Sequence, residues 1–432
     1  MRNALYILIA VVALWGCNSS KSLIYQNTAQ VYQQETVLMR PEFAIQHLND
    51  SVSRLYYMVN AHDLLYARIT GTDTFKAQMR ISYSLYNSLE ESEVLSSDTV
   101  YFSDHTLQPK DKRIEGFIDI ATSNMSSGLI LLNTSDLNRD FHFRSYVFVE
   151  RKSDVGRQSF SIYDSKGRIC YSPYFRVGQS IYLHHESPRD SIYIRYYNRD
   201  FPLAAPPYVI QNDQPFNYLP DSSYRIAFTD TLALNQRGFY HLQFDTATTE
   251  GVTVFAFYAE FPHVSKAEHL VPPMRYITTQ KEYAAMAGKK EAEEFWLQNS
   301  GSPDRARVLI KTYYNRVVDA NKHFSSYMEG WKTDRGIVYV IFGPPNIIYR
   351  TTNSESWIYG EENSMLSYNF TFVRVDNPFT SNDFALNRSS VYRYSWSQAV
   401  DTWRQGRIFN VTNVQRAQDE TRRQFNRPYF WY

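Results

Sequence analysis

Cysteine is nearly absent from this sequence, which has only Cys17 and Cys170 among 432 residues. Two cysteines allow at most one internal disulfide, and the position of Cys17 directly after an apolar run suits a different role. The fold must therefore be stabilised by the packing of its core rather than by cross-links. Cys170 lies in the apolar context RICYSPYF, which predicts a buried position in a strand.

Charge of one sign is also lacking, since the net charge is +1 and no long run of Lys or Arg occurs. Phosphate recognition normally needs a concentrated basic face, so nucleic acid is excluded as a partner. The sequence has no phosphate-binding glycine loop, no nucleophile elbow and no spaced His/Cys set for zinc. His184 and His185 are adjacent, so on a strand they point to opposite faces and make a poor chelate. We therefore expect no cofactor, no metal and no recognisable catalytic set.

Long apolar runs are limited to the N-terminus, where Arg2 precedes the stretch ALYILIAVVALWG. This stretch is too short to span a bilayer comfortably and is typical of a signal peptide. Its end, LWGC, resembles a bacterial lipobox, which implies cleavage after residue 16 and acylation of Cys17. Several acyl chains, at about 0.8 kcal/mol per buried methylene, would anchor the protein stably in outer-membrane lipid. The alternative is an ordinary signal peptide followed by an incidental cysteine.

The residues after Cys17 bear on the membrane face. Residues 18–21 read Asn-Ser-Ser-Lys and contain no acidic cluster. Surface-exposed lipoproteins of Bacteroidetes-type bacteria often carry an acidic export signal at this position. We therefore expect the chain to be lipid-anchored in the outer membrane, on its periplasmic face.

Aromatic residues, by contrast, are abundant, with 35 tyrosines and 27 phenylalanines. Tyrosine suits half-buried strands, and it also forms carbohydrate-binding platforms, so both interpretations stay open at this point. From about residue 43 to 260 apolar residues alternate with polar ones, as in QMRISYSL at 78–85. Such a pattern with polar turns predicts two antiparallel β-sandwiches, at 45–151 and 158–262. A tether with a short helix, 17–44, precedes them.

The periodicity becomes helical after residue 262. Residues 303–324 predict an amphipathic helix that begins with Ser302 as N-cap and Pro303 in its first turn. Two short helices are expected within 278–299 and another at 397–407, and strands are expected at 337–342, 356–359 and 367–375. The fold class is thus mainly β with a compact C-terminal α/β or α+β unit at 263–432. This unit includes an aromatic tail, NRPYFWY, that either caps an apolar surface or docks on the sheet edge of a partner.

The stretch GWKTDRGIVYVIFGPPN, residues 330–346, is the most distinctive part of this unit. Gly330 can take a positive φ and end the preceding element, and Trp331 must bury its ring. Residues 333–336, Thr-Asp-Arg-Gly, have the chemistry of a turn. Residues 337–342 carry no strongly polar side chain and predict a strand covered on both faces. Gly343, Pro344 and Pro345 then end that strand.

These residues resemble the GWxTD domain family, named for Gly330, Trp331, Thr333 and Asp334. The likeness extends from PPMRYITTQKEY, EEFW and YYNRVVDANKHFS upstream to RGIVYVIFGPPN and ESWIY downstream, covering roughly 270–400. The resemblance implies a bacterial envelope protein, notably of Bacteroidetes, often with β-rich N-terminal regions. It implies no reaction, because the biochemical role of the family is not established.

Two interpretations of the motif compete. In a catalytic one, Asp334 acts as a base with Arg335 or His323, and Glu355 has a raised pKa beside Trp357. In a structural or binding one, the motif builds the domain. The structural interpretation accounts for every motif residue: Gly330, Trp331, Thr333, Asp334, Gly336, Gly343, Pro344, Pro345, Glu355 and Trp357.

The sequence therefore favours a non-enzymatic lipoprotein that acts as a scaffold or interaction subunit in envelope assembly or secretion. Its expected partners are outer-membrane lipid, through Cys17, and another envelope protein. A glycan-binding or glycan-processing lipoprotein is the alternative. A hydrolase centred on Asp334 and Glu355 is a third and less favoured possibility.

Overall fold

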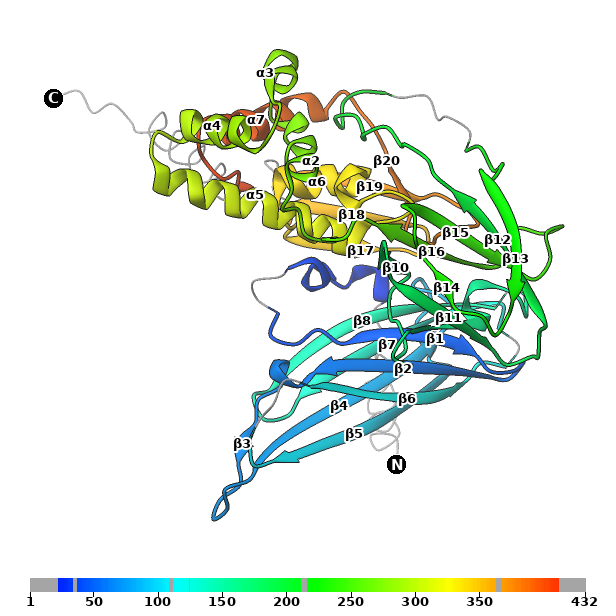
Figure 1. Ribbon diagram of the computed structural model, residues 1–432. Coiled ribbons are helices and arrows are strands. Elements are labelled where there is room, and N and C mark those ends of the chain that lie inside the picture. Colours follow the sequence, from blue (N-terminus) through cyan, green and yellow to red (C-terminus); the bar gives the residue numbers. More distant parts are fainter. Residues whose placement is uncertain are drawn as a thin grey trace, which may run out of the picture.

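A computed structural model describes seven stretches of the chain: 22–33, 37–108, 112–123, 125–151, 153–210, 216–362 and 367–411. Cys17, the predicted signal peptide before it and the aromatic tail lie outside the described residues. Within these stretches the protein is mainly β, and its α-helices follow residue 266 (Figure 1). This arrangement confirms the predicted fold class. None of the helices in these stretches combines the length and the apolar character needed to cross a membrane.

The first unit consists of two antiparallel sheets packed face to face. The smaller sheet has the order β1–β2–β6, with β1 (Glu42–His47), β2 (Val52–Asn60) and β6 (Arg113–Ala121). In the larger sheet β4 pairs with β3, β5 and β7, and β7 pairs with β8. Its strands are β3 (Ala67–Arg68), β4 (Phe75–Tyr86), β5 (Ser96–Thr106), β7 (Ser127–Asp136) and β8 (Phe141–Glu150). A short 3-10 helix, η3 (Ala61–Asp63), follows β2.

The core of this unit lies between its two sheets because alternate side chains point inward. Met79, Ile81 and Leu85 of β4 are buried together with Leu55 of β2 and Ile118 of β6. Burial along β4 alternates as the sequence pattern predicted. The unit is a β-sandwich.

The second unit also has two sheets. The smaller one has the order β14–β11–β9, with β9 (Phe160–Asp164), β11 (Ser180–His185) and β14 (Leu232–Ala233). The larger one has the order β10–β16–β15–β12–β13. Its strands are β10 (Tyr174–Arg176), β12 (Ser191–Tyr197), β13 (Ser222–Ala227), β15 (Gly238–Gln243) and β16 (Val252–Phe257). The pairing is antiparallel except between β10 and β16. A 3-10 helix, η4 (Arg157–Ser159), leads into β9.

The prediction for Cys170 was wrong. Cys170 is half-buried and lies after β9, outside any strand, although its backbone N–H donates to the carbonyl of Ile162 at 2.8 Å. Burial raises the pKa of its thiol to about 11. Cys170 and its apolar neighbours lie in a loop that packs against the core of the second unit. In the sequence, such a loop has the same apolar pattern as a buried strand.

The C-terminal unit combines helices with one antiparallel sheet of order β17–β18–β19–β20. The strands are β17 (Ile347–Arg350), β18 (Ser354–Tyr359), β19 (Tyr368–Arg374) and β20 (Phe384–Leu386). The helices are α2 (Ala267–Leu270), η5 (Pro272–Tyr276), α3 (Gln280–Ala285), α4 (Lys289–Ser300), α5 (Pro303–Phe324), η6 (Gly330–Lys332), α6 (Asp334–Phe342) and α7 (Tyr392–Arg404). As predicted, Ser302 caps α5, because its hydroxyl accepts from the N–H of Arg305 at 3.3 Å.

The predicted strand at 337–342 is a helix instead. Thr333 is the N-cap of α6, and its hydroxyl accepts a hydrogen bond from the N–H of Gly336 at 3.1 Å. The expected turn at 333–336 is therefore the first turn of this helix. Every residue from 335 to 342 is buried, so α6 is covered on all sides and needs no polar face. A short apolar run cannot be assigned to strand or helix by periodicity alone.

The N-terminal segment joins the first unit to the last one. Residues 22–33 form two 3-10 helices, η1 (Leu23–Tyr25) and η2 (Ala29–Tyr32), that lie between β17 and β8 (Figure 1). Leu23 is buried with Leu89 and Leu129 of the first unit, whereas Tyr32 is buried in the core of the C-terminal unit. This N-terminal arm, residues 22–33, thus belongs to both units.

Candidate functional site

The motif glycines bring three pieces of backbone together. A Cβ atom on Gly330 would lie 1.8 Å from the carbonyl oxygen of Ala320 in α5. A Cβ atom on Gly336 would lie 1.8 Å from the carbonyl oxygen of Gly330. Only glycine permits such approaches. The positive φ expected at Gly330 does not occur. Glycine is needed at this position because of the close contact with the backbone of α5.

The loop that carries Trp331 is fixed by polar contacts to α5. Ser325 accepts a hydrogen bond from the N–H of Gly330 at 2.9 Å and donates to the carbonyl of Asn321 at 2.7 Å. The Asn321 side chain accepts from the N–H of Trp331 at 3.4 Å and donates to the carbonyl of Pro262 at 3.0 Å. Trp331 is buried, as predicted. These contacts hold the start of α6 against α5.

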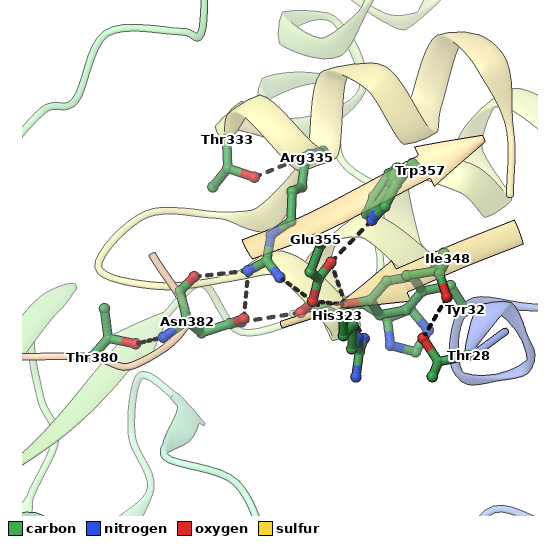
Figure 2. A network of polar contacts seen from close by, with 12 residues as sticks. Thr28, Tyr32, His323, Thr333, Arg335, Ile348, Glu355, Trp357, Thr380 and Asn382 are labelled. Atoms are coloured by element: carbon green, nitrogen blue, oxygen red, sulfur yellow. Dashed lines mark hydrogen bonds and ion pairs between the residues drawn. The ribbon is translucent and has the colours of Figure 1, made fainter. Parts of the chain in front are cut away.

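Glu355 on β18 is the centre of a buried polar cluster (Figure 2). Its carboxylate lies 3.4 Å from Arg335 of α6 and 3.3 Å from Arg350 of β17. It also accepts hydrogen bonds from the indole N–H of Trp357 at 3.0 Å and from the hydroxyl of Tyr32 at 3.1 Å. Four side chains from four different segments thus converge on one carboxylate.

The pKa of Glu355 is lowered, contrary to the raised value expected beside a tryptophan. Burial alone raises the pKa, but Arg350 and Arg335 favour the charged form, and so do the hydrogen bonds from Trp357 and Tyr32. Arg335 and Arg350 are themselves buried, with side chains 3% and 13% exposed. A carboxylate held this way stays ionised and is unsuited to donate or take up a proton near neutral pH.

Tyr32 reaches this cluster from the N-terminal arm, 323 residues away in the sequence. Its hydroxyl donates to Glu355 and accepts from Arg350 at 2.7 Å, and its carbonyl accepts from the hydroxyl of Tyr339 at 2.8 Å. Burial raises the pKa of the phenol, and the Glu355 charge raises it further against the effect of Arg350, so Tyr32 is a neutral donor. Its ring packs against Phe324 and Trp357 at centroid distances of 4.9 and 5.5 Å.

The rest of the arm pairs with the edge strand β17. The N–H and the hydroxyl of Thr28 both donate to the carbonyl of Ile348, at 2.9 and 3.2 Å. The side chain of Asn27 accepts from the N–H of Ile348 at 3.0 Å and donates to the carbonyl of Asn346 at 3.2 Å. The arm therefore covers an edge strand whose backbone would otherwise be unpaired.

His323 at the end of α5 lies beside this arm rather than beside Asp334. Its ring centroid is 5.2 Å from that of Tyr32. Burial, followed by the charges of Arg40 and Lys322, lowers the pKa of His323 to about 3. His323 is therefore neutral at physiological pH and is not an acid–base partner of Asp334.

Asp334, the other candidate carboxylate, has its own arginine. It forms an ion pair with Arg388 and accepts a hydrogen bond from the N–H of Leu386 at 2.7 Å. Arg388 in turn donates to the carbonyls of Ala205 and Pro206, at 2.8 and 2.9 Å. Asp334 thus ties the start of α6 to β20 and to the second unit.

The remaining motif residues end α6. Gly343 follows the helix, and its carbonyl accepts from the hydroxyl of Tyr359 at 2.8 Å. Pro344 is exposed, whereas Pro345 is buried and its carbonyl accepts from the side chain of Gln33 at 3.5 Å. Their expected stop occurs, although it stops a helix.

The structure separates the residues of the expected catalytic site. Asp334 and Glu355 are each neutralised by different arginines, and Arg335 pairs with Glu355 rather than with Asp334. No group of three or more His, Cys, Asp or Glu side chains in the described stretches is arranged to hold a metal ion. The arrangement is a set of structural anchors.

The same region matches a known family. Residues 238–405 match the model of the GWxTD domain. The chain contains a GWxTD domain. Among curated proteins, none matches the sequence.

The matched region begins at Gly238, the first residue of β15, and so precedes the predicted boundary at 263. Aromatic packing joins this part of the second unit to the C-terminal unit. Phe239 of β15 and Tyr197 of β12 lie 5.0 and 5.1 Å from Phe379 of the C-terminal unit, by ring centroids. Tyr327, between α5 and η6, also packs against Phe239. The matched region therefore includes β15, which carries Phe239, but not β12, which carries Tyr197.

Sequence reasoning missed several residues of the site: Tyr32, Arg350, Asn382 and Arg388. Asn382 accepts from Arg335 through its carbonyl at 3.0 Å and donates through its side chain to the carbonyl of Ser325 at 2.8 Å. The sequence offered one general reason to expect such partners: carboxylates that are placed in a core need cations beside them.

Proposed function

We propose that this protein is a lipid-anchored outer-membrane protein of a Bacteroidetes-type envelope that acts as a non-enzymatic scaffold or interaction subunit. It would serve envelope assembly or secretion from the periplasmic face, and its GWxTD domain would bind another envelope protein. The observation that carries the proposal is the state of the two motif carboxylates. Both are held in ion pairs inside the domain, which favours a structural role over the hydrolase alternative.

The N-terminal arm supports the anchored part of the proposal. The Ser22 hydroxyl donates to the carbonyls of Leu89 and Glu90, at 3.3 and 3.2 Å, so the arm is attached to the body from its first described residue. Five residue steps separate Cys17 from Ser22, which reach at most about 18 Å when extended. An acylated Cys17 would hold the protein close to the bilayer, where a membrane-bound partner is within reach.

Isolation from membranes tests the anchor and the partner together. We expect the full chain, tagged after the described region and extracted in detergent, to co-purify with a stoichiometric envelope protein. A Cys17→Ser variant should be released from the membrane fraction. A full-length chain that is monodisperse and without a partner contradicts the scaffold, and a Cys17→Ser variant that stays in the membrane contradicts the anchor.

Cross-linking identifies the unit that binds. Lys281, Lys289 and Lys311 are exposed on the helices of the GWxTD domain, whereas Lys112 and Lys166 are exposed on the two β-rich units. With an amine-reactive cross-linker and mass spectrometry, we expect links to the partner from the first group. Links from Lys112 and Lys166 alone would assign the binding to the β-rich units instead.

Glu355 and Trp357 are buried and bond to each other inside the core, so this pair offers no surface to a glycan. Many tyrosines serve as core residues in the same way. A separate cavity supports glycan binding on different grounds.

A further inference from the structure

A cavity lies where all three units meet. It has a volume of about 730 Å³. Its walls come from the ends of β7 and β8 in the first unit, from the segment before β16 in the second unit, and from the turn before β18 and the end of β19 in the GWxTD domain. The volume is in the range of about 300–1,000 Å³ that is typical of sites for small ligands, which often form between domains.

The charged groups of this junction cavity nearly cancel, with three carboxylates and two arginines, which argues against a strongly charged ligand. Arg157 and Arg374 both face Glu150, and their nitrogens lie 3.8 and 2.6 Å from its carboxylate oxygens. Glu250 and Asp376 add two further carboxylates to the wall. An anionic ligand would be repelled by the three carboxylates. A cationic ligand would gain little attraction, because the two arginines already offset most of the negative charge.

Arg157 has unused hydrogen-bonding capacity at the cavity. Its contacts are long, 3.5 Å to the carbonyl of Pro378 and 3.8 Å to the carboxylate of Glu150. Burial lowers the pKa of its guanidinium, and Glu150 only partly compensates. A guanidinium with five N–H donors and two long contacts can bond hydroxyl oxygens of a ligand.

The rim offers planar polar groups next to aromatic rings. Within the described stretches, the side chains of Asn353 and Asp376 have no hydrogen-bond partner, and both residues are exposed. Tyr218 is 49% exposed at the same rim, and Phe148 contributes a second ring. Carboxylates and amides can bond two neighbouring hydroxyl groups, and a ring face can stack on the C–H face of a sugar.

The wall geometry distinguishes an oligosaccharide from a peptide. A peptide that binds through its main chain adds to an exposed strand edge. The cavity instead meets strands at their ends: β7 begins at Ser127, β8 ends at Glu150, β16 begins at Val252 and β19 ends at Arg374. Strand ends and turns present side chains rather than a continuous row of backbone groups.

We propose that the junction cavity binds an uncharged oligosaccharide, bonded by Asn353, Asp376 and Arg157 and stacked on Tyr218. This site is independent of the proposed scaffold function, since a partner and a glycan would contact different surfaces. It also assigns a role to the junction itself, because three units must be in place for the site to exist.

Binding to an array of neutral and charged oligosaccharides tests the proposal, with the full chain in detergent. Tyr218→Ala and Asn353→Ala are the test variants. The controls are Tyr101→Ala on β5, where the residue is 69% exposed, and Asn369→Ala on β19, where it is also exposed; neither control residue lines the cavity. We expect the parent chain to retain neutral oligosaccharides. Binding should be at least tenfold weaker in both test variants and should stay within twofold of the parent in both controls. All four variants should keep the Tm of the parent chain.

Three results would overturn the proposal. The first is that no oligosaccharide on the array is retained, and the second is that only charged ones are. The third is that Tyr218→Ala and Asn353→Ala bind as well as the controls. A peptide library run in parallel provides the remaining comparison, since peptide binding that depends on Tyr218 would replace the oligosaccharide as the ligand class.

Discussion

The charge of Glu355 should be a major source of stability for the GWxTD domain. In a Glu355→Gln variant the shape of the side chain is kept, and the amide oxygen can still accept from Trp357. Arg335 and Arg350, however, lose the carboxylate that lies 3.4 and 3.3 Å from them. Removing one partner of a buried ion pair costs about 3–5 kcal/mol.

The lower end of this range applies here because both arginines keep neutral partners. Arg335 still donates to the carbonyl of Asn382, and Arg350 still donates to the hydroxyl of Tyr32. We therefore expect a loss of about 3 kcal/mol in the free energy of unfolding. For a unit of this size that corresponds to a Tm lower by roughly 6–12 °C.

Tryptophan fluorescence is a suitable assay, because every tryptophan in the described stretches belongs to the GWxTD domain. They are Trp296, Trp331, Trp357, Trp396 and Trp403. Urea unfolding followed by this signal reports on the domain rather than on the two β-rich units. The matched control is Glu361→Gln, an exposed carboxylate just after β18 that should change the free energy by less than about 0.5 kcal/mol. A loss below about 1 kcal/mol for Glu355→Gln, with an unchanged fluorescence spectrum, would refute the reasoning.

Three further predictions concern the same domain. Tyr32→Phe should cost about 1–3 kcal/mol by the same assay, because it removes the hydroxyl that donates to Glu355. Stability should fall with acidification from about pH 6.5 toward pH 3, by up to about 1.4 kcal/mol per pH unit, because burial lowers the pKa of His323 and the unfolded chain binds the proton first. His323→Gln should flatten the stability profile between about pH 6.5 and 4.5. Gly336→Ala should prevent the domain from folding, because the added methyl group would overlap the carbonyl of Gly330.

Each of these has its own control. For the arm, Tyr25→Phe alters an exposed ring and should leave stability unchanged, so equal effects at both tyrosines would argue against a specific role for Tyr32. For the pH profile, the lowered pKa of Glu355 adds a further loss of stability below about pH 4.5. If the His323→Gln variant had the same profile as the parent above that pH, the pH dependence would have to come from another group. Gly71→Ala, at a turn with open space around it, should fold where Gly336→Ala does not.

The helices of the GWxTD domain show what the sequence can predict. The helix α5 has a cap, a proline in its first turn and an apolar stripe, so its position follows from local chemistry. The helix α6 has an equally good cap in Thr333, but its β-branched apolar run suggested a strand. The deciding fact is that other elements cover α6 on every side, which is a property of the tertiary structure.

Several residues of the site could be named from the sequence, but which side chains pair with one another could not. Glu355, Trp357 and Asp334 were identified as candidates, and they are indeed points where several segments meet. Their arginine partners decide the chemistry, and those partners are set by strand register and by the path of the chain. Tyr32 lies in a short stretch with weak helical character, and no sequence feature links it to a strand more than 300 residues later.

The docked N-terminal arm also has a consequence for the order of folding. The arm leaves the ribosome first, yet its binding site on β17 and β18 exists only once residue 355 has been made, 323 residues later. At about 5–20 residues per second this takes roughly 16–65 s, during which Tyr32 has no complete site to bury its side chain. A chain truncated before β18 would lack the Glu355 carboxylate to which the Tyr32 hydroxyl donates. Burial of Tyr32 thus requires that the chain has been made at least through β18.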